Sequence, residues 1–160
     1  VSKQWIDWVS GIYKGFAEVE LNGKYNYINT EGQLLSKWWV DCAYTFKAGF
    51  GVVKLNGKWN FINTEGQLLS QQWFDGVDYF NEGLAEVNLN GKYNFINAEG
   101  QLLSQQWFDS VGIFYDGVVK VILNGKYNFI NPEGKLLFQQ WFDDVRTFYK
   151  GFTEVKLKNK

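Results

Sequence analysis

The chain has 160 residues, a formal net charge of −1 and an aromatic content of 19%. It contains no histidine, one cysteine and one proline, which excludes histidine-based catalytic triads, histidine metal sites and an intramolecular disulfide. The balanced charge argues against a nucleic-acid partner, and the lack of an apolar run of about 18 residues argues against membrane insertion. We expect no enzyme activity, no cofactor and no metal ion, and the sequence does not indicate a compartment.

A repeat of 34 residues organises the chain, as the step from Trp5 to Trp39 shows. The repeated tryptophans are Trp5, Trp39, Trp73, Trp107 and Trp141. The units run approximately over residues 5–38, 39–72, 73–106 and 107–140, with a partial unit at 141–160. Residues 1–4 match the end of a preceding unit. We therefore treat residues 1–160 as a single repeat domain, either a piece of a longer array or one capped elsewhere.

Each unit begins with a connecting stretch in which one position is always apolar. This position holds Ile12, Phe46, Phe80, Phe114 and Phe148. One apolar anchor among freely varying neighbours predicts a loop pinned by a single side chain. In the first unit a strand with period-two alternation follows at residues 15–21, then an Asn-Gly pair, then a second strand at 24–29. This pattern predicts a β-hairpin.

The register of this hairpin depends on its loop. A two-residue loop would place Val19 opposite Asn26 and mix apolar with polar side chains on both faces. A three-residue loop with a bulge and a left-handed Gly23 separates them, because it pairs Val19 with Tyr25 and Glu18 with Asn26. We therefore expect the bulged loop.

A second turn and a third strand complete the predicted unit. The turn at residues 29–32 has asparagine first and glycine fourth, as in a type I turn, and its second position holds the only proline, Pro132, in the fourth unit. We expect the third strand at residues 33–36. Each unit is thus predicted to be a three-stranded antiparallel meander followed by the connecting stretch.

The repeated side chains allow two interpretations each. The aromatic residues either pack between successive meanders or, as a tryptophan ladder, stack on sugar rings; we favour packing. The repeated aspartates either cap backbone N–H groups or bind Ca²⁺ or act as catalytic carboxylates; we favour caps. The repeated lysines and glutamates are predicted to be solvated, and the repeated asparagines to bond across to loops. These aspartates are Asp7, Asp41, Asp75, Asp109 and Asp143. Cys42 is expected to be inert, because its position varies between units.

The unit resembles the WG (or KWG) β-rich repeat family of bacterial proteins. The residues that carry the resemblance are Phe74-Asp75, the stretch from Phe80 to Val87, and the stretch from Asn90 to Gly100. The chain departs from the family pattern where Trp-Gly is expected, because it has Trp59-Asn60 in one unit and Tyr-Asn in the others. The resemblance implies an all-β repeat module, often an accessory part of a larger protein, with no enzyme activity and no established ligand.

We expect an all-β fold of stacked meanders in an open, curved array, with a closed five-unit ring as the alternative. The expected function is a non-catalytic binding or scaffold module for a protein partner, and the alternative is a carbohydrate or cell-wall binder that uses the tryptophan ladder. A catalytic pair of carboxylates is disfavoured, because no unit differs chemically from the others. Self-association through unpaired end strands is a further expectation. The predicted partner-binding residues occupy one variable loop position: Tyr13, Lys47, Asn81, Tyr115 and Tyr149.

Overall fold

The structure, a computed structural model, describes residues 5–158. The expected end of a preceding unit at residues 1–4 lies outside this part of the chain. The described residues form strands and no helix, so no helix there could cross a membrane. The first two units contain β1 (Trp8–Val9), β2 (Phe16–Leu21), β3 (Lys24–Asn29), β4 (Cys42–Lys47), β5 (Phe50–Leu55) and β6 (Lys58–Asn63). The next two contain β7 (Gly76–Val77), β8 (Leu84–Leu89), β9 (Lys92–Asn97), β10 (Ser110–Val111), β11 (Val119–Leu123) and β12 (Lys126–Ile130). The partial unit contains β13 (Asp144–Val145) and β14 (Val155–Lys156).

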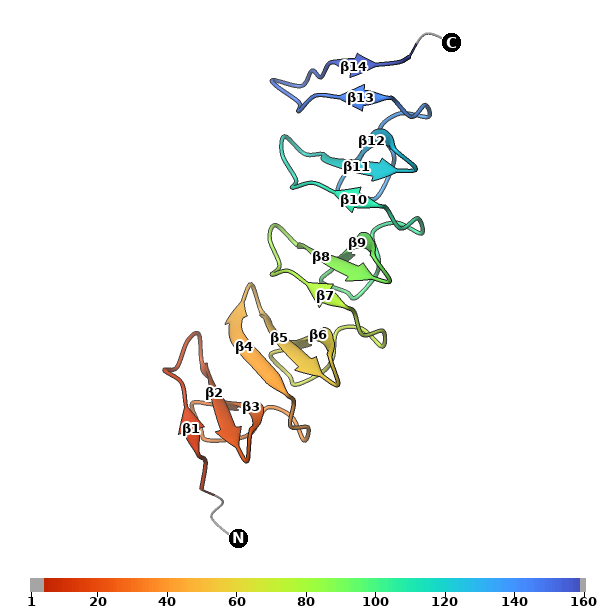
Figure 1. Ribbon diagram of the computed structural model, residues 1–160. Coiled ribbons are helices and arrows are strands. Elements are labelled where there is room, and N and C mark those ends of the chain that lie inside the picture. The colour runs from red at the N-terminus through yellow and green to blue at the C-terminus, as the bar shows by residue number, and fades with distance from the viewer. Residues whose placement is uncertain (1–4, 159–160) are drawn as a thin grey trace.

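Each complete unit forms its own antiparallel sheet. The sheets have the orders β1-β2-β3, β4-β5-β6, β7-β8-β9 and β10-β11-β12, and the partial unit adds the pair β13-β14. Figure 1 shows these sheets following one another, with the two ends of the chain at opposite ends of an elongated molecule. The prediction of an open array of three-stranded meanders is confirmed, and the ring is not formed.

The third strand of each sheet lies at a different place from the predicted one. It is the short strand before the hairpin, such as β1, within the stretch expected to be a loop. Residues 33–36 form no strand and contribute only a single bridge between Ile28 and Leu34. The cause is the buried Asn26, whose Nδ2 donates to the carbonyl of Ser36 at 2.8 Å and so fixes this segment through a side chain instead of a ladder.

The predicted bulged loop is wrong. The first hairpin has the two-residue loop, with Val19 opposite Asn26 and Leu21 opposite Lys24. Asn22 and Gly23 both have positive φ, 51° and 75°, as a type I′ turn requires. The bulged register would keep asparagine away from the valines. In the structure the Asn26 side chain is buried on the core face with its hydrogen bonds satisfied, so the mixture carries no penalty.

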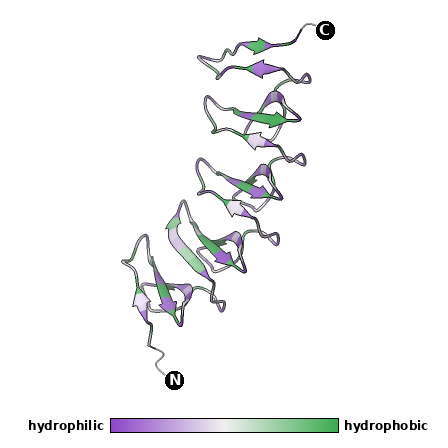
Figure 2. Ribbon diagram, in the orientation of Figure 1, coloured by the Kyte–Doolittle hydropathy of each residue, from purple (hydrophilic) through white to green (hydrophobic). Residues whose placement is uncertain are grey.

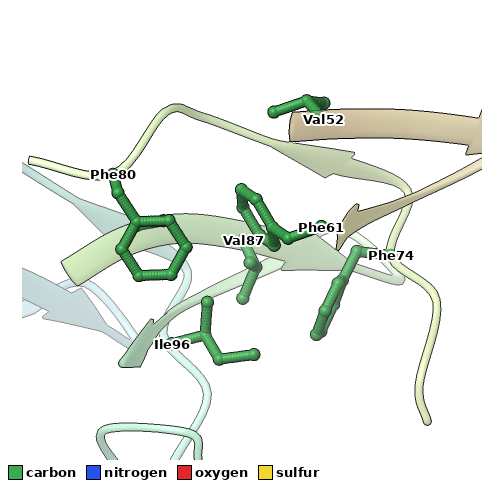
Figure 3. Close-up of a cluster of buried hydrophobic side chains, with 7 residues drawn as sticks. Val52, Phe61, Phe74, Phe80, Val87 and Ile96 are labelled. Carbon is green, nitrogen blue, oxygen red and sulfur yellow. The ribbon is translucent and has the colours of Figure 1, made fainter. Parts of the chain in front are cut away.

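The hydrophobic core lies between the units. In each cluster, one aromatic residue from the last strand of a unit (β3, β6, β9 or β12) packs against side chains of the next unit. Phe61, for example, packs against Phe74, Phe80, Val87 and Ile96 (Figure 3). The same role is taken by Tyr27, Phe95 and Phe129 in the other clusters. Figure 2 shows hydrophobic and hydrophilic residues mixed along the strands of every unit. One meander therefore obtains its core only by stacking on a neighbour.

The predicted anchor residues lie at this interface between units. Phe46 and Phe80 are buried, and Phe114 and Phe148 are half-buried against the aromatic residues in the last strands of the preceding units. Ile12 is 62% exposed, because the described chain has no unit before the first. The anchors therefore act between units.

Backbone contacts also join the units. Tyr25 and Val40 exchange two N–H···O=C hydrogen bonds of 2.8 and 2.9 Å across the first boundary. The corresponding bridges are Trp59–Phe74, Tyr93–Phe108 and Tyr127–Phe142. The turn glycines of the later units lie so close to the preceding unit that a Cβ on Gly100 would be 2.2 Å from the carbonyl oxygen of Leu69.

Candidate binding face

The repeated aspartates form a structural network at the hairpin turns. Oδ2 of Asp41 accepts the backbone N–H of Asn56 at 2.7 Å, while Oδ1 pairs with the ammonium group of Lys24 from the preceding unit. Asp75, Asp109 and Asp143 repeat both contacts, and Asp7 makes the backbone contact. These hydrogen bonds, above all that from Lys24, hold the pKa of Asp41 below its ordinary value.

This network extends one prediction and favours one interpretation. The repeated lysines keep 44–51% of their side-chain surface exposed, as expected for solvated charges, and also form ion pairs across the unit boundaries: Lys24, Lys58, Lys92 and Lys126. The aspartates act as backbone caps, as favoured. Among residues 5–158, no three His, Cys, Asp or Glu side chains are grouped so that they could hold a metal ion.

The repeated asparagines are internal hydrogen-bonding residues. Asn60 and Asn94 are fully buried, and each Nδ2 donates to a serine carbonyl, of Ser70 at 2.7 Å and of Ser104 at 2.8 Å. Each Oδ1 accepts the next backbone N–H at 2.8 Å. The expected bonds to loops are formed, and these amides are not available to a ligand.

The tryptophan ladder does not form an open platform. Trp39, Trp73, Trp107 and Trp141 are half-buried, and the last three pack against the core clusters. Trp5 is 85% exposed at the N-terminal end of the described array. Three of the five indoles proposed for sugar stacking therefore serve the packing between units.

The predicted partner-binding residues are all exposed. Each is the first residue of the turn that joins the first and second strands of its unit, as in the bridge from Tyr13 to Phe16. These turns lie along one long edge of the array in Figure 1. Stacking therefore places Tyr13, Lys47, Asn81, Tyr115 and Tyr149 in one row.

Four further variable positions lie beside this row, and none of them was among the predicted binding residues. Cross-strand pairing places them together on one face of each sheet; in the second unit they are Cys42 opposite Lys54 and Tyr44 opposite Val52, of which Val52 is buried in the core between units. The corresponding residues of the third unit are Gly76, Asp78, Glu86 and Asn88, and those of the fourth are Ser110, Gly112, Lys120 and Ile122. We call this surface, together with the predicted row, the outer face. Chemical variation at alternate positions of two paired strands was the signal that could have revealed it.

Grooves cross the outer face at the unit boundaries. The groove between the third and fourth units is lined by Asp78, Glu82 and Glu86 on one side and by Ile113 and Phe114 on the other. The groove before it shares Asp78 and Tyr79, and the groove after it shares Gly112, Ile113 and Phe114. Burial, and then the neighbouring charge of Asp78, raise the pKa of the Glu86 carboxyl. Adjacent grooves therefore share wall residues, and the groove between the third and fourth units is the acidic one.

Comparison with known proteins agrees with this architecture, which defines a tandem β-meander repeat array. The model of the family described as WG containing repeat matches residues 6–25, 27–59, 61–93, 95–127 and 129–160. The chain belongs to this family, and the predicted resemblance is confirmed. Comparison with curated protein sequences finds no match.

Solved structures give only distant matches. Kluyveromyces lactis Hsv2 is 11% identical with a TM-score of 0.46, and the match covers 84% of this chain and 50% of that one. Hsv2 described as from Kluyvelomyces marxianus is 14% identical with a TM-score of 0.45, covering 82% and 50%. A protein of unknown function from Bacteroides caccae is 14% identical with a TM-score of 0.34, covering 92% and 68%. The chain spans about half the length of the Hsv2 structures it matches.

Proposed function

We propose that the protein is a non-catalytic binding module whose outer face takes a protein partner. This proposal rests on one observation: the repeat positions that vary between units lie on a different part of the molecule from those that are constant. The second half of each complete unit, from the Leu-Asn-Gly turn onward, is nearly identical in all four units. The positions that change in charge and size lie together on the outer face. A constant scaffold with one variable face is the arrangement by which repeat proteins build extended binding surfaces.

The side chains of the outer face suit a protein ligand. Four exposed aromatic residues lie on it, Tyr13, Tyr44, Tyr115 and Tyr149. Two further exposed residues, Tyr79 and Ile113, line its grooves. Charged residues such as Asp78 and Lys120 stand between them. Large apolar side chains with interspersed polar groups are typical of protein interfaces. The carbohydrate alternative has less support, because most of the tryptophan ladder is occupied by packing between units.

A photocrosslinking experiment tests the proposal. A benzoylphenylalanine at position 115, on the outer face, should form adducts with discrete proteins in an extract of the source cells. The matched control carries the same group at Leu136, which is 45% exposed but belongs to a position that is leucine in every complete unit. Alanine at Tyr149 should reduce the adducts from position 115. Equal adducts from both positions, or none from position 115, would contradict the proposal.

Iodide quenching tests the carbohydrate alternative separately. Trp73, Trp107 and Trp141 contact core clusters and should be shielded from iodide in the free protein. If most of the tryptophan fluorescence were accessible and were then protected by a cell-wall glycan, the sugar-binding alternative would replace the present proposal.

A further inference from the structure

We infer that the groove between the third and fourth units binds a cationic side chain, arginine or lysine, of an extended peptide segment that has apolar residues on both sides of the cation. This inference rests on the proposed function and names the chemistry of the partner. The groove is lined by Asp78, Glu82 and Glu86 and by Ile113 and Phe114.

The carboxylates supply the charge complementarity. Asp78 directly follows β7 and lies opposite Glu86 of β8, and the backbone N–H of Asp78 donates to the carbonyl of Glu86 at 2.9 Å. Glu82 lies in the turn between these strands. None of the ion pairs found within residues 5–158 involves any of the three. Two like charges in a partly buried groove repel each other, and a ligand cation would relieve this repulsion.

The opposite wall supplies the apolar contacts. Ile113 is 86% exposed beside the half-buried Phe114, which packs edge-on against Phe95 at a ring-centroid distance of 5.1 Å. An exposed isoleucine next to carboxylates can cover the aliphatic stem of a long cationic side chain while its charged end reaches the acids.

A glycine opens the groove. Gly112 occupies the position held by Tyr44 in the second unit, Asp78 in the third and Arg146 in the fifth. A Cβ on Gly112 would meet no atom closer than 3.6 Å, so the fold has room for a side chain there. The space next to the carboxylates therefore depends on the absence of a side chain in the fourth unit.

The neighbouring grooves indicate an extended peptide as the occupant. The groove toward the second unit is lined by Trp59 and Tyr79, and the groove toward the fifth by Phe129 and Phe148. Because adjacent grooves share residues, a chain lying along the array would place apolar side chains in both while its cation meets the acids. The outer face already holds cations on aromatic rings within the chain, with Lys54 Nζ 5.0 Å from the ring of Trp59.

Fluorescence anisotropy with two short labelled peptides tests the inference on the full chain. The first probe has one arginine between two phenylalanines in a glycine–serine background. The second has citrulline, the neutral isostere, in place of the arginine. The arginine probe should bind about tenfold or more tightly than the citrulline probe, since a charge-assisted pair is lost in the second. Equal affinity of the two probes, or no saturable binding of the arginine probe, would overturn the inference.

Two variants test the location of the site. Each introduces a residue that another unit has at the same position, so the fold should be retained. Glu86→Lys introduces the residue of the fourth unit, Lys120, and Gly112→Tyr introduces that of the second, Tyr44. Each should weaken the arginine probe at least about tenfold, through repulsion and through filling of the groove respectively. Glu31→Lys makes the same charge change on an exposed turn of the first unit and should leave binding unchanged. Wild-type affinity in both groove variants would place the cation elsewhere and refute the inference.

The outcomes separate this inference from the proposed function. Partner adducts from position 115 with no preference for the arginine probe would retain the outer face as a binding surface and reject the cationic ligand. Absence of partner adducts together with binding of the arginine probe would reject the proposed function and retain only a cation-binding groove.

Discussion

Gly51 and Tyr27 form a matched pair across the first unit boundary. A Cβ on Gly51 would lie 2.6 Å from Oη of Tyr27 and 2.8 Å from its Cζ. The Tyr27 hydroxyl donates to the carbonyl of Tyr44. At the next boundary the same two positions hold Phe61 and Ala85, so the extra hydroxyl of the tyrosine coincides with the missing methyl of the glycine.

We predict that Gly51→Ala destabilises the protein by about 1 to 3 kcal/mol, because overpacking must displace the buried tyrosine ring. Tyr27→Phe alone should cost about 0.5 to 1.5 kcal/mol, the value of a typical hydrogen bond. In the Tyr27→Phe background, Gly51→Ala should be neutral or should stabilise by about 0.5 to 1 kcal/mol, because the clash is gone and alanine is a better strand residue than glycine.

Equilibrium urea unfolding followed by tryptophan fluorescence measures all four proteins of this double-mutant cycle. The coupling should be about 1 to 3 kcal/mol in favour of the double variant, within the range found for residues in contact. The m-values should remain equal, so that differences in midpoint report stability. Strictly additive effects of the two substitutions would refute the claim that the units are packed against each other at this point.

Three further predictions follow from the described contacts. Gly100→Ala should lower the free energy of unfolding by about 2 to 5 kcal/mol, because the new methyl group would clash with the carbonyl of Leu69. Gly91→Ala is the control, since Gly91 lies in the same unit and also has a positive φ but has no atom near its Cβ position. It should lower the free energy of unfolding by only about 1 to 2 kcal/mol. Asn94→Ala should cost about 2 to 4 kcal/mol in urea unfolding, because it leaves buried backbone groups unpaired. Glu86→Gln should raise the urea midpoint at pH 7. A raised folded-state pKa means that the charged carboxylate destabilises the fold, so this difference should vanish below about pH 4.5, where the carboxyl is protonated in both states. A smaller cost for Gly100→Ala than for Gly91→Ala, a neutral Asn94→Ala or a pH-independent effect of Glu86→Gln would each contradict the corresponding contact.

The sequence was sufficient for the features that depend on local chemistry and on the period. The hairpin strands, the capping role of Asp41 and its equivalents, and the packing role of the aromatic residues followed from alternation, turn residues and repetition. The open array followed from the repeat pattern and its partial unit.

The features that depend on contacts between segments could not be predicted in this way. The register was missed because a buried Asn26 with satisfied hydrogen bonds looks, in sequence, like a surface residue. The third strand was misplaced because β1 has only two residues and obtains its order from pairing with β2. The groove at Glu86 was missed because its walls belong to different units.

The most direct test of the binding account is a transplantation of the outer face from one unit to the next. Four residues of the fourth unit are replaced by those at the same positions of the third: Gly112→Asp, Ile113→Tyr, Tyr115→Asn and Lys120→Glu. The variant should unfold at a urea midpoint close to that of the wild type, because the scaffold already accommodates these side chains one unit earlier. A photocrosslinker at position 149 should lose its partner adducts in this variant. Adducts of wild-type yield in a folded variant would contradict the claim that the outer face is the binding surface.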